Sequence, residues 1–207
     1  MIDDNSEEAG RRYCALRQSN SGERGAAPPP RFHYEALHPR FIRILELHPG
    51  KRSDPFEGQF IIASIDSDVN YDALSYVWGD ATPADRVIVD GAAIPIAWNL
   101  ARALEYLRDF KSSESLRIWI DALCINQHDE EERASQVAMM RLLYWKAECV
   151  RVWIHEPGFE EGSPAVTALQ KFDPEPEDEH SGLGENPHLW EPVVPLSRNC
   201  FWSRIWM

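Results

Sequence analysis

The 207-residue sequence lacks the patterns of zinc-binding, secreted and membrane-spanning proteins. Its four cysteines include no Cys-x-x-Cys pair, and none has a histidine at zinc-finger spacing, so we expect no metal site. No stretch approaches the roughly 18 apolar residues of a membrane-spanning helix. The first residues contain no apolar run of the signal-peptide type. We therefore expect a cytoplasmic chain with free thiols and no membrane span.

Positive charge is also scarce in this sequence. There are 21 Lys and Arg residues against 34 Asp and Glu residues, which gives a net charge of −13. A chain this acidic repels phosphate backbones, so we expect no nucleic-acid binding. Much of the excess lies in residues 156–191, where ten acidic residues face Lys171 alone. The hydrophobic fraction of 43% and the eight tryptophans are typical of a globular core.

Composition divides the chain into three parts, the last of which contains an insertion. Residues 1–33 are polar and end near a proline run, which predicts a disordered N-terminal tail. Residues 34–70 contain two β-like runs, FIRILEL and QFIIASI, with turn residues between them. They predict an N-terminal β extension, formed as a hairpin or as two strands at the edge of a sheet. Residues 71–207 form the main domain, in which the acidic, proline-rich segment 157–195 is interpreted as a mobile insertion.

The main domain alternates strands and helices. The apolar patterns predict strands at 71–77, 86–89, 92–98, 116–120 and 149–154, and helices at 99–110 and 129–148. Asp90-Gly91, between two of the strands, predicts a tight hairpin that protrudes as an insertion. This order predicts an α/β fold with a mostly parallel sheet flanked by helices.

Local signals fix the ends and faces of the two helices. Asn99 is expected to cap the first helix. Asp129 and Glu132 stand three residues apart and predict a capping box for the second. One apolar stripe of the second helix should face the core, namely Val137, Met140, Tyr144 and Ala147. Met139 and Leu143 widen this stripe, so we expect the helix to contact the core on more than one side.

Polar residues follow two of the predicted strands. Ser75, Trp78, Gly79 and Asp80 end or follow the first, and Asp121, Asn126 and Gln127 follow the strand at 116–120. Parallel strands place their carboxyl ends at one edge of a sheet, where α/β proteins bind ligands. There Gly79 would let backbone approach a ribose or phosphate, and Trp78 would stack a base. These seven residues form a candidate cofactor-binding pocket.

A purely structural interpretation of the same residues stays open. Trp78 would fill core, Gly79 would make a turn, and Asp80 would cap it. Asp121 and Asn126 would bond to their own backbone and fix a loop. For Cys124, a buried structural thiol is favoured over a nucleophile, because no His–Asp partnership is visible. No catalytic residue is assigned.

Three sequence blocks resemble a known family. They are YDALSYVWGD (71–80), the block from Ile118 to Ile154 that begins IWIDALCINQ, and FWSRIW (201–206). In type and order they resemble the fungal heterokaryon incompatibility (HET) domain. The resemblance implies an effector or signalling module in non-self recognition and programmed cell death. It also implies a protein partner or self-association.

The HET family is remotely similar to TIR domains, which are flavodoxin-like, and some TIR domains hydrolyse NAD⁺. That similarity implies an alternative function as an NAD-hydrolysing enzyme. By the same resemblance, the catalytic Glu would lie just beyond Met207, so the chain is interpreted as truncated at its C-terminus. We therefore expect no enzymatic activity from this chain. No cofactor is assigned, and NAD enters only as the ligand or substrate of the alternative.

Overall fold

The computed structural model describes residues 27–51, 54–108 and 114–154. The chain divides into two compact units, one ending at Trp153 and one beginning at Ile154. All helices and strands given below belong to the first unit. The predicted insertion at 157–195, the FWSRIW block and residues 1–26 of the predicted tail lie outside the described residues.

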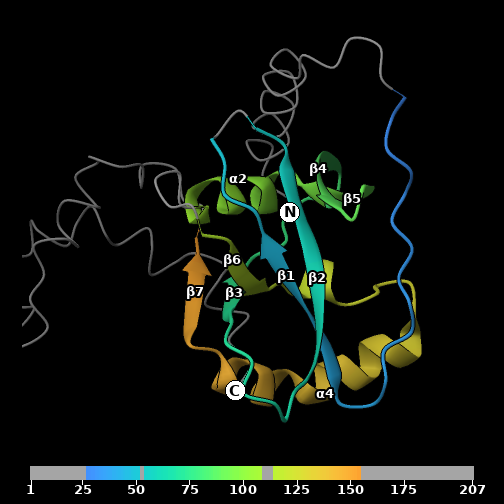
Figure 1. Cartoon of the computed structure of the whole chain (residues 1–207), viewed down its shortest axis with the longest axis vertical. Helices are drawn as coiled ribbons and strands as arrows, with labels where there is room; N and C mark the ends of the chain where they lie inside the picture. The colour runs from blue at the N-terminus through green and yellow to red at the C-terminus, as the bar shows by residue number, and fades with distance from the viewer. Residues whose placement is uncertain (1–26, 52–53, 109–113, 155–207) are drawn as a thin grey trace, which may run out of the picture. The chain divides into compact units, whose positions relative to one another are not determined.

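A seven-stranded sheet forms the centre of the first unit (Figure 1). Its order is β5-β4-β2-β1-β6-β3-β7. The strands are β1 (Phe41–Leu47), β2 (Phe56–Ser64), β3 (Asp72–Tyr76), β4 (Pro83–Val89), β5 (Ala92–Ala97), β6 (Leu116–Trp119) and β7 (Cys149–Trp153). The helices are α2 (Trp98–Leu107), α3 (Asp121–Cys124) and α4 (Glu130–Lys146). In Figure 1, α2 is drawn near the top of the sheet and α4 below it.

The α/β class is confirmed, but the sheet is mixed where a mostly parallel one was predicted. Strand β3 pairs in parallel with β6 and β7, and β2 pairs in parallel with β4. The other three pairings, β1–β2, β1–β6 and β4–β5, are antiparallel. The reason is the position of the predicted N-terminal hairpin. It lies in the middle of the sheet instead of at its edge, and β1 joins β6 in antiparallel register.

Central placement explains the burial of β1. Five of its seven residues are buried, including Arg43, and Ile42, Ile44 and Leu45 are fully covered. Side chains on both faces of β1 are buried, so its polar residue needs a partner inside the protein. The alternation in FIRILEL therefore does not mark a face exposed to solvent.

The Asp90-Gly91 hairpin is confirmed. Asp90 has φ 51° and Gly91 has φ 79°, and the two residues connect β4 to β5 in antiparallel pairing. Positive φ at both central residues is the geometry that tight hairpins require. On its other side β5 meets the segment before β1, where Phe32 N–H donates to Ala93 O at 3.0 Å. Ala93 N–H in turn donates to Pro30 O at 2.7 Å.

The two helix starts differ in how well the sequence predicted them. Asp129 caps α4 as predicted, because its carboxylate accepts hydrogen bonds from Glu131 N–H and Glu132 N–H, both at 3.0 Å. The cap predicted at Asn99 is wrong. Helix α2 begins one residue earlier, at Trp98, and no side chain caps it. Asn99 is buried and is used elsewhere.

The core-facing side of α4 agrees with the prediction at Leu143 and Met139, but not at Val137. Its buried residues are Glu132, Gln136 and Leu143, whereas Val137 is 50% exposed. Met140, Tyr144 and Ala147 pack against the core from partly buried positions. The predicted stripe fails at Val137 because two polar side chains take the buried positions. Gln136 Nε2 donates to Phe41 O at 2.8 Å, and Glu132 pairs with Arg43.

Gly58 tests the packing of the central strands. A Cβ at this position would lie 2.4 Å from the backbone oxygen of Glu46, which cannot move without distorting β1. We expect Gly58→Ala to lower the free energy of unfolding by about 2 to 3 kcal/mol, as overpacking does. Urea denaturation measures the change. The neighbouring exposed substitution Glu57→Ala is the control and should change stability by less than about 0.5 kcal/mol. Equal stability of both variants would contradict the register of β1 and β2.

Candidate functional site

The loops after β3 and β6 meet at one edge of the sheet, as predicted. The indole Nε1 of Trp78 donates to both carboxylate oxygens of Asp121, at 3.1 and 3.0 Å. Trp78 follows β3 and Asp121 follows β6, and these strands are parallel neighbours. The contact therefore ties the two candidate loops together by a charge-assisted hydrogen bond.

Asp121 is the centre of this edge. It opens α3, where Ala122 N–H donates to its Oδ1 at 2.7 Å, and Gln127 Nε2 donates to its backbone oxygen at 2.8 Å. Tyr144 lies close enough to Asp121 for the carboxylate charge to affect the Tyr144 hydroxyl. Burial first, and the Asp121 carboxylate second, raise the pKa of Tyr144, so its hydroxyl stays protonated. The Tyr144 hydroxyl donates to Leu74 O at 3.2 Å, and Ser75, on β3, pairs in register with Val152 of β7.

The remaining candidates make local turns. Asp80 Oδ1 accepts from Thr82 N–H at 3.0 Å and from Thr82 Oγ1 at 2.9 Å, and these bonds lower the pKa of Asp80. Asn126 Oδ1 accepts from His128 N–H at 3.2 Å. Gly79 has φ 68°, and no atom lies within 4 Å of where its Cβ would stand. Asp80 and Asn126 thus make the local turn contacts that the structural interpretation predicted. Trp78 and Gln127, by contrast, both donate hydrogen bonds to Asp121.

The sequence analysis missed a buried ion pair that holds the segment between β6 and α4 in place. The Arg43 guanidinium and the Glu132 carboxylate are paired, with side chains only 3% and 6% exposed. Arg43 Nη2 donates to Glu132 Oε2 at 3.0 Å, and Nη1 donates to Cys124 O at 3.2 Å. Glu132 Oε1 accepts from Asn126 N–H at 2.7 Å. The signal was available, because an arginine inside an apolar strand requires a buried acceptor.

Tyr34 adds a second contact from the N-terminal side. Its hydroxyl donates to Leu123 O at 2.9 Å, and the Arg43 guanidinium carbon lies 5.0 Å from the centre of its ring. Burial is the main cause that raises the pKa of the Tyr34 hydroxyl, so it remains a donor. The loop from Asp121 to His128 is therefore held by residues that precede Tyr71 in the sequence as well as by Glu132.

Cys124 is a buried thiol, as predicted. It is fully covered and free, and Ile120 N–H donates to its Sγ at 3.3 Å. Burial raises the pKa of Cys124 to about 12. A thiol that stays protonated is a poor nucleophile, so the geometry gives Cys124 a packing role.

Asn99 is a further residue near this edge that the sequence analysis did not assign to it. Its Nδ2 donates to Val77 O, and its Oδ1 accepts from Trp153 Nε1 at 2.9 Å. The Trp153 ring lies 5.2 Å from the ring of Tyr106 on α2. Asn99 thus links the end of β3 to the end of β7 through α2. Its position one residue into a helix resembled a cap, which hid this role.

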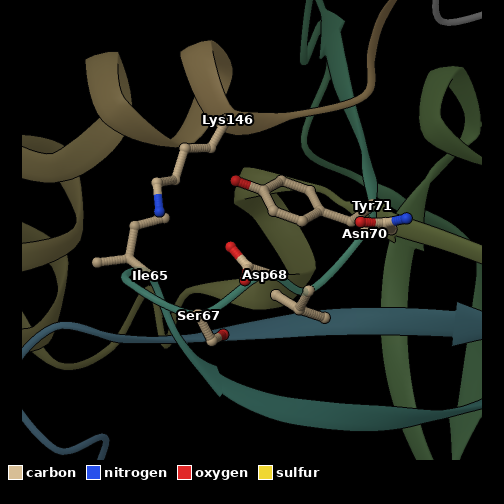
Figure 2. Close-up of a pocket in the computed structure, with 7 residues that line it drawn as sticks. Ile65, Ser67, Asp68, Asn70, Tyr71 and Lys146 are labelled. Carbon is tan, nitrogen blue, oxygen red and sulfur yellow. The ribbon is translucent and has the colours of Figure 1, made fainter.

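The candidate residues do not line either of two cavities that lie among the described residues. The first, about 190 Å³, lies where the β2–β3 loop faces the end of α4 (Figure 2). Figure 2 shows the Tyr71 ring pointing toward α4, and the Tyr71 hydroxyl donates to Leu143 O at 2.7 Å. The second, about 400 Å³, is lined by Arg108 and Arg151 among others. Within residues 27–51, 54–108 and 114–154 there is no cluster of possible metal ligands. No helix in those ranges is long and apolar enough to cross a membrane.

Comparisons with known proteins agree with the sequence blocks. The model of the family described as "Heterokaryon incompatibility protein (HET)" matches residues 71–207. The chain is 36% identical over 159 residues to "Heterokaryon incompatibility protein 6, OR allele" of Neurospora crassa. That alignment covers 71% of this chain and 23% of the relative, so the chain spans about a quarter of the relative's length. No solved structure matches the chain.

The Trp78–Asp121 bond can be tested by removing only its donor. Trp78→Phe keeps an aromatic ring but leaves the Asp121 carboxylate without the indole N–H, and should cost about 1 to 2 kcal/mol of unfolding free energy. Trp145→Phe is the matched control, because Trp145 is 78% exposed, and should change stability by less than about 0.5 kcal/mol. Urea denaturation of both variants and of wild type measures these changes in the free energy of unfolding. A Trp78→Phe melt that coincides with wild type would show that the bond contributes nothing.

The buried thiol makes stability fall at alkaline pH. Cys124 has an ordinary pKa of 9.0 and a folded value of about 12. Between these values the unfolded chain binds fewer protons than the folded chain, so stability is lost as pH rises. The loss attributable to this thiol should be about 1 kcal/mol between about pH 9 and pH 10. Burial also raises the pKa of Tyr71 to about 12, from an ordinary value of 10.0, so its contribution appears later.

Urea denaturation at about pH 9 and pH 10 measures this loss. The loss should be about 1 kcal/mol smaller in Cys124→Ala than in wild type, whatever the variant's stability at neutral pH, because the buried tyrosines Tyr34, Tyr71 and Tyr144 contribute equally to both proteins. Cys149→Ala, at an exposed cysteine, should retain it. The burial account fails if all three proteins lose the same stability over this interval.

Proposed function

The chain belongs to the heterokaryon incompatibility family, and on that basis we propose that it is an effector or signalling module of fungal non-self recognition that leads to programmed cell death. The observation that carries the proposal is the family match over residues 71–207. The Neurospora relative, named as a heterokaryon incompatibility protein, supports it. We propose that the module acts in the cytoplasm through a protein partner or by self-association. The described cysteines, Cys124 and Cys149, are free thiols, which supports a reducing compartment.

We propose that the working module extends beyond the family match at its N-terminal side. Strands β1 and β2, within the predicted extension 34–70, occupy the middle of the sheet. Arg43 and Tyr34 hold the loop that begins at Asp121. The tail predicted over 1–33 and the mobile insertion predicted over 157–195 remain part of the same proposal, except that Pro30 and Phe32 are hydrogen-bonded to Ala93 of β5.

The finer fold and site assignments are proposals as well. A TIR-like arrangement is supported by the parallel set β6, β3 and β7, with α4 between β6 and β7 in the chain. The pocket of Ser75, Trp78, Gly79, Asp80, Asp121, Asn126 and Gln127 is supported chiefly by the Trp78–Asp121 contact. No described feature favours NAD hydrolysis, and no residue of this chain is given a catalytic role.

Inducible expression in a filamentous fungus tests the proposed function. Wild-type chain should lower viability clearly below that of a culture carrying the empty vector. Asp121→Asn, which weakens the link between the two loops, should kill less. Asp66→Asn, an exposed surface change, should kill as wild type does. Immunoblots must show equal abundance of the three proteins.

Cellular NAD⁺ measured in the same cultures separates the two functions. Under the proposal, NAD⁺ stays constant until viability falls. A drop in NAD⁺ that precedes cell death, and its reproduction by purified chain, would replace the proposal by the hydrolase alternative. Abundant, folded wild-type chain without any loss of viability would contradict the effector role of this chain.

A further inference from the structure

One side of α4 carries an exposed stripe of arginine and large apolar side chains. The stripe repeats every fourth residue, as Arg133, Val137, Arg141 and Trp145. Residues at this spacing lie along one side of a helix. All four are exposed, Val137 by 50% and Trp145 by 78%. We propose that this stripe, called the basic face below, is a docking surface for an acidic, partly apolar segment of a partner protein.

The charge of the basic face stands out in this protein. The chain contains 34 acidic residues, yet α4 has none from Arg133 to Lys146. Among the described residues, neither the Arg133 nor the Arg141 guanidinium has a hydrogen bond or ion pair. Arg40, by contrast, is paired with Asp66 although both are exposed. Within the described ranges no carboxylate competes for these two guanidinium groups, and arginine binds carboxylates in bidentate geometry.

The apolar residues of the basic face do not serve the core. The core side of α4 is made by Glu132, Gln136 and Leu143. Tryptophan and arginine are the residues that most often anchor protein interfaces. Ala134 and Ala138, both exposed, lie beside the stripe on the same helix and let another backbone approach closely. A partner segment with carboxylates at four-residue spacing and apolar residues between them would match this pattern.

Other occupants fit less well. Two copies meeting through this face would place arginine against arginine, and like charges repel. Phosphate-rich nucleic acid is repelled by the net charge of −13. An anionic membrane gains only about 1 kcal/mol for each arginine near its surface, which is little against that net charge. An acidic protein segment gains from both the arginines and the apolar side chains.

Purified full-length chain and two synthetic helical peptides test this proposal. The acidic probe is a fluorescein-labelled peptide of about 15 residues with Glu at every fourth position beside a leucine stripe. The basic probe is identical except that Lys replaces Glu. Fluorescence anisotropy should show binding of the acidic probe alone. Raising the salt to about 0.5 M should weaken that binding several-fold, because the contacting charges are near the surface.

Variants of the chain locate the binding. Arg133→Glu combined with Arg141→Glu should weaken binding of the acidic probe by about tenfold or more and create binding of the basic probe. Trp145→Ala should weaken acidic-probe binding by a similar factor. Lys51→Glu combined with Arg86→Glu changes net charge equally, in the loop after β1 and on β4, and should leave the affinity within about twofold. Circular dichroism confirms that each variant is folded.

The outcomes that overturn the proposal are distinct. Either no binding of the acidic probe or equal weakening by both double variants would remove the basic face as the binding surface. A wild-type dimer that Arg133→Glu/Arg141→Glu dissociates would make a second copy the occupant instead. The proposal does not depend on the role in incompatibility, because peptide binding by purified chain is measured independently of cell death.

Discussion

The buried ion pair between Arg43 and Glu132 is the constraint on which the described structure depends most. Both side chains are almost fully removed from water, so each charge is stable there only because the other is present. The pair joins β1, the central strand, to the first turn of α4. Additional hydrogen bonds to Cys124 O and from Asn126 N–H bring the intervening loop into the same network. One interaction therefore fixes the relative positions of a strand, a loop and a helix.

The candidate site depends on that network. Asp121 begins the loop that ends near the pair, and its carboxylate receives the indole N–H of Trp78 from the neighbouring loop. The family match begins at Tyr71, whereas Arg43 and Tyr34 precede it. Residues outside the matched region, on β1 and in the segment before it, therefore help to hold the loop that follows β6. The arrangement of side chains at the ends of β3 and β6 depends on these contacts. The exposed side of α4 is set by the same pair, because Glu132 determines which side of the helix faces inward.

The sequence predicted the local elements better than their assembly. Periodicity located the strands, the Asp90-Gly91 hairpin and the cap at Asp129, because these depend on neighbouring residues. The prediction that the strands within 34–70 lie at the sheet edge was wrong. The place of a strand in a sheet depends on contacts with residues distant in sequence, which periodicity does not show. Asn99 resembled a helix cap but bonds to Val77 and Trp153. At the site, the meeting of Trp78 with Asp121 followed from parallel pairing. The local turns of Asp80 and Asn126 matched the structural interpretation. That Glu132 is the partner of Arg43 could not be predicted from the sequence, because the two residues meet only in the folded chain.

A double-mutant cycle on Arg43 and Glu132 tests this account most directly. Arg43→Met and Glu132→Gln should each lower the free energy of unfolding by about 3 to 5 kcal/mol, because each leaves one buried charged group without its partner. The double variant should be much less destabilised than the sum of the two, with a coupling of about 2 kcal/mol or more between the sites. Additive effects of the two substitutions, measured by urea denaturation, would contradict the claim that this pair organises the strand, the loop and the helix.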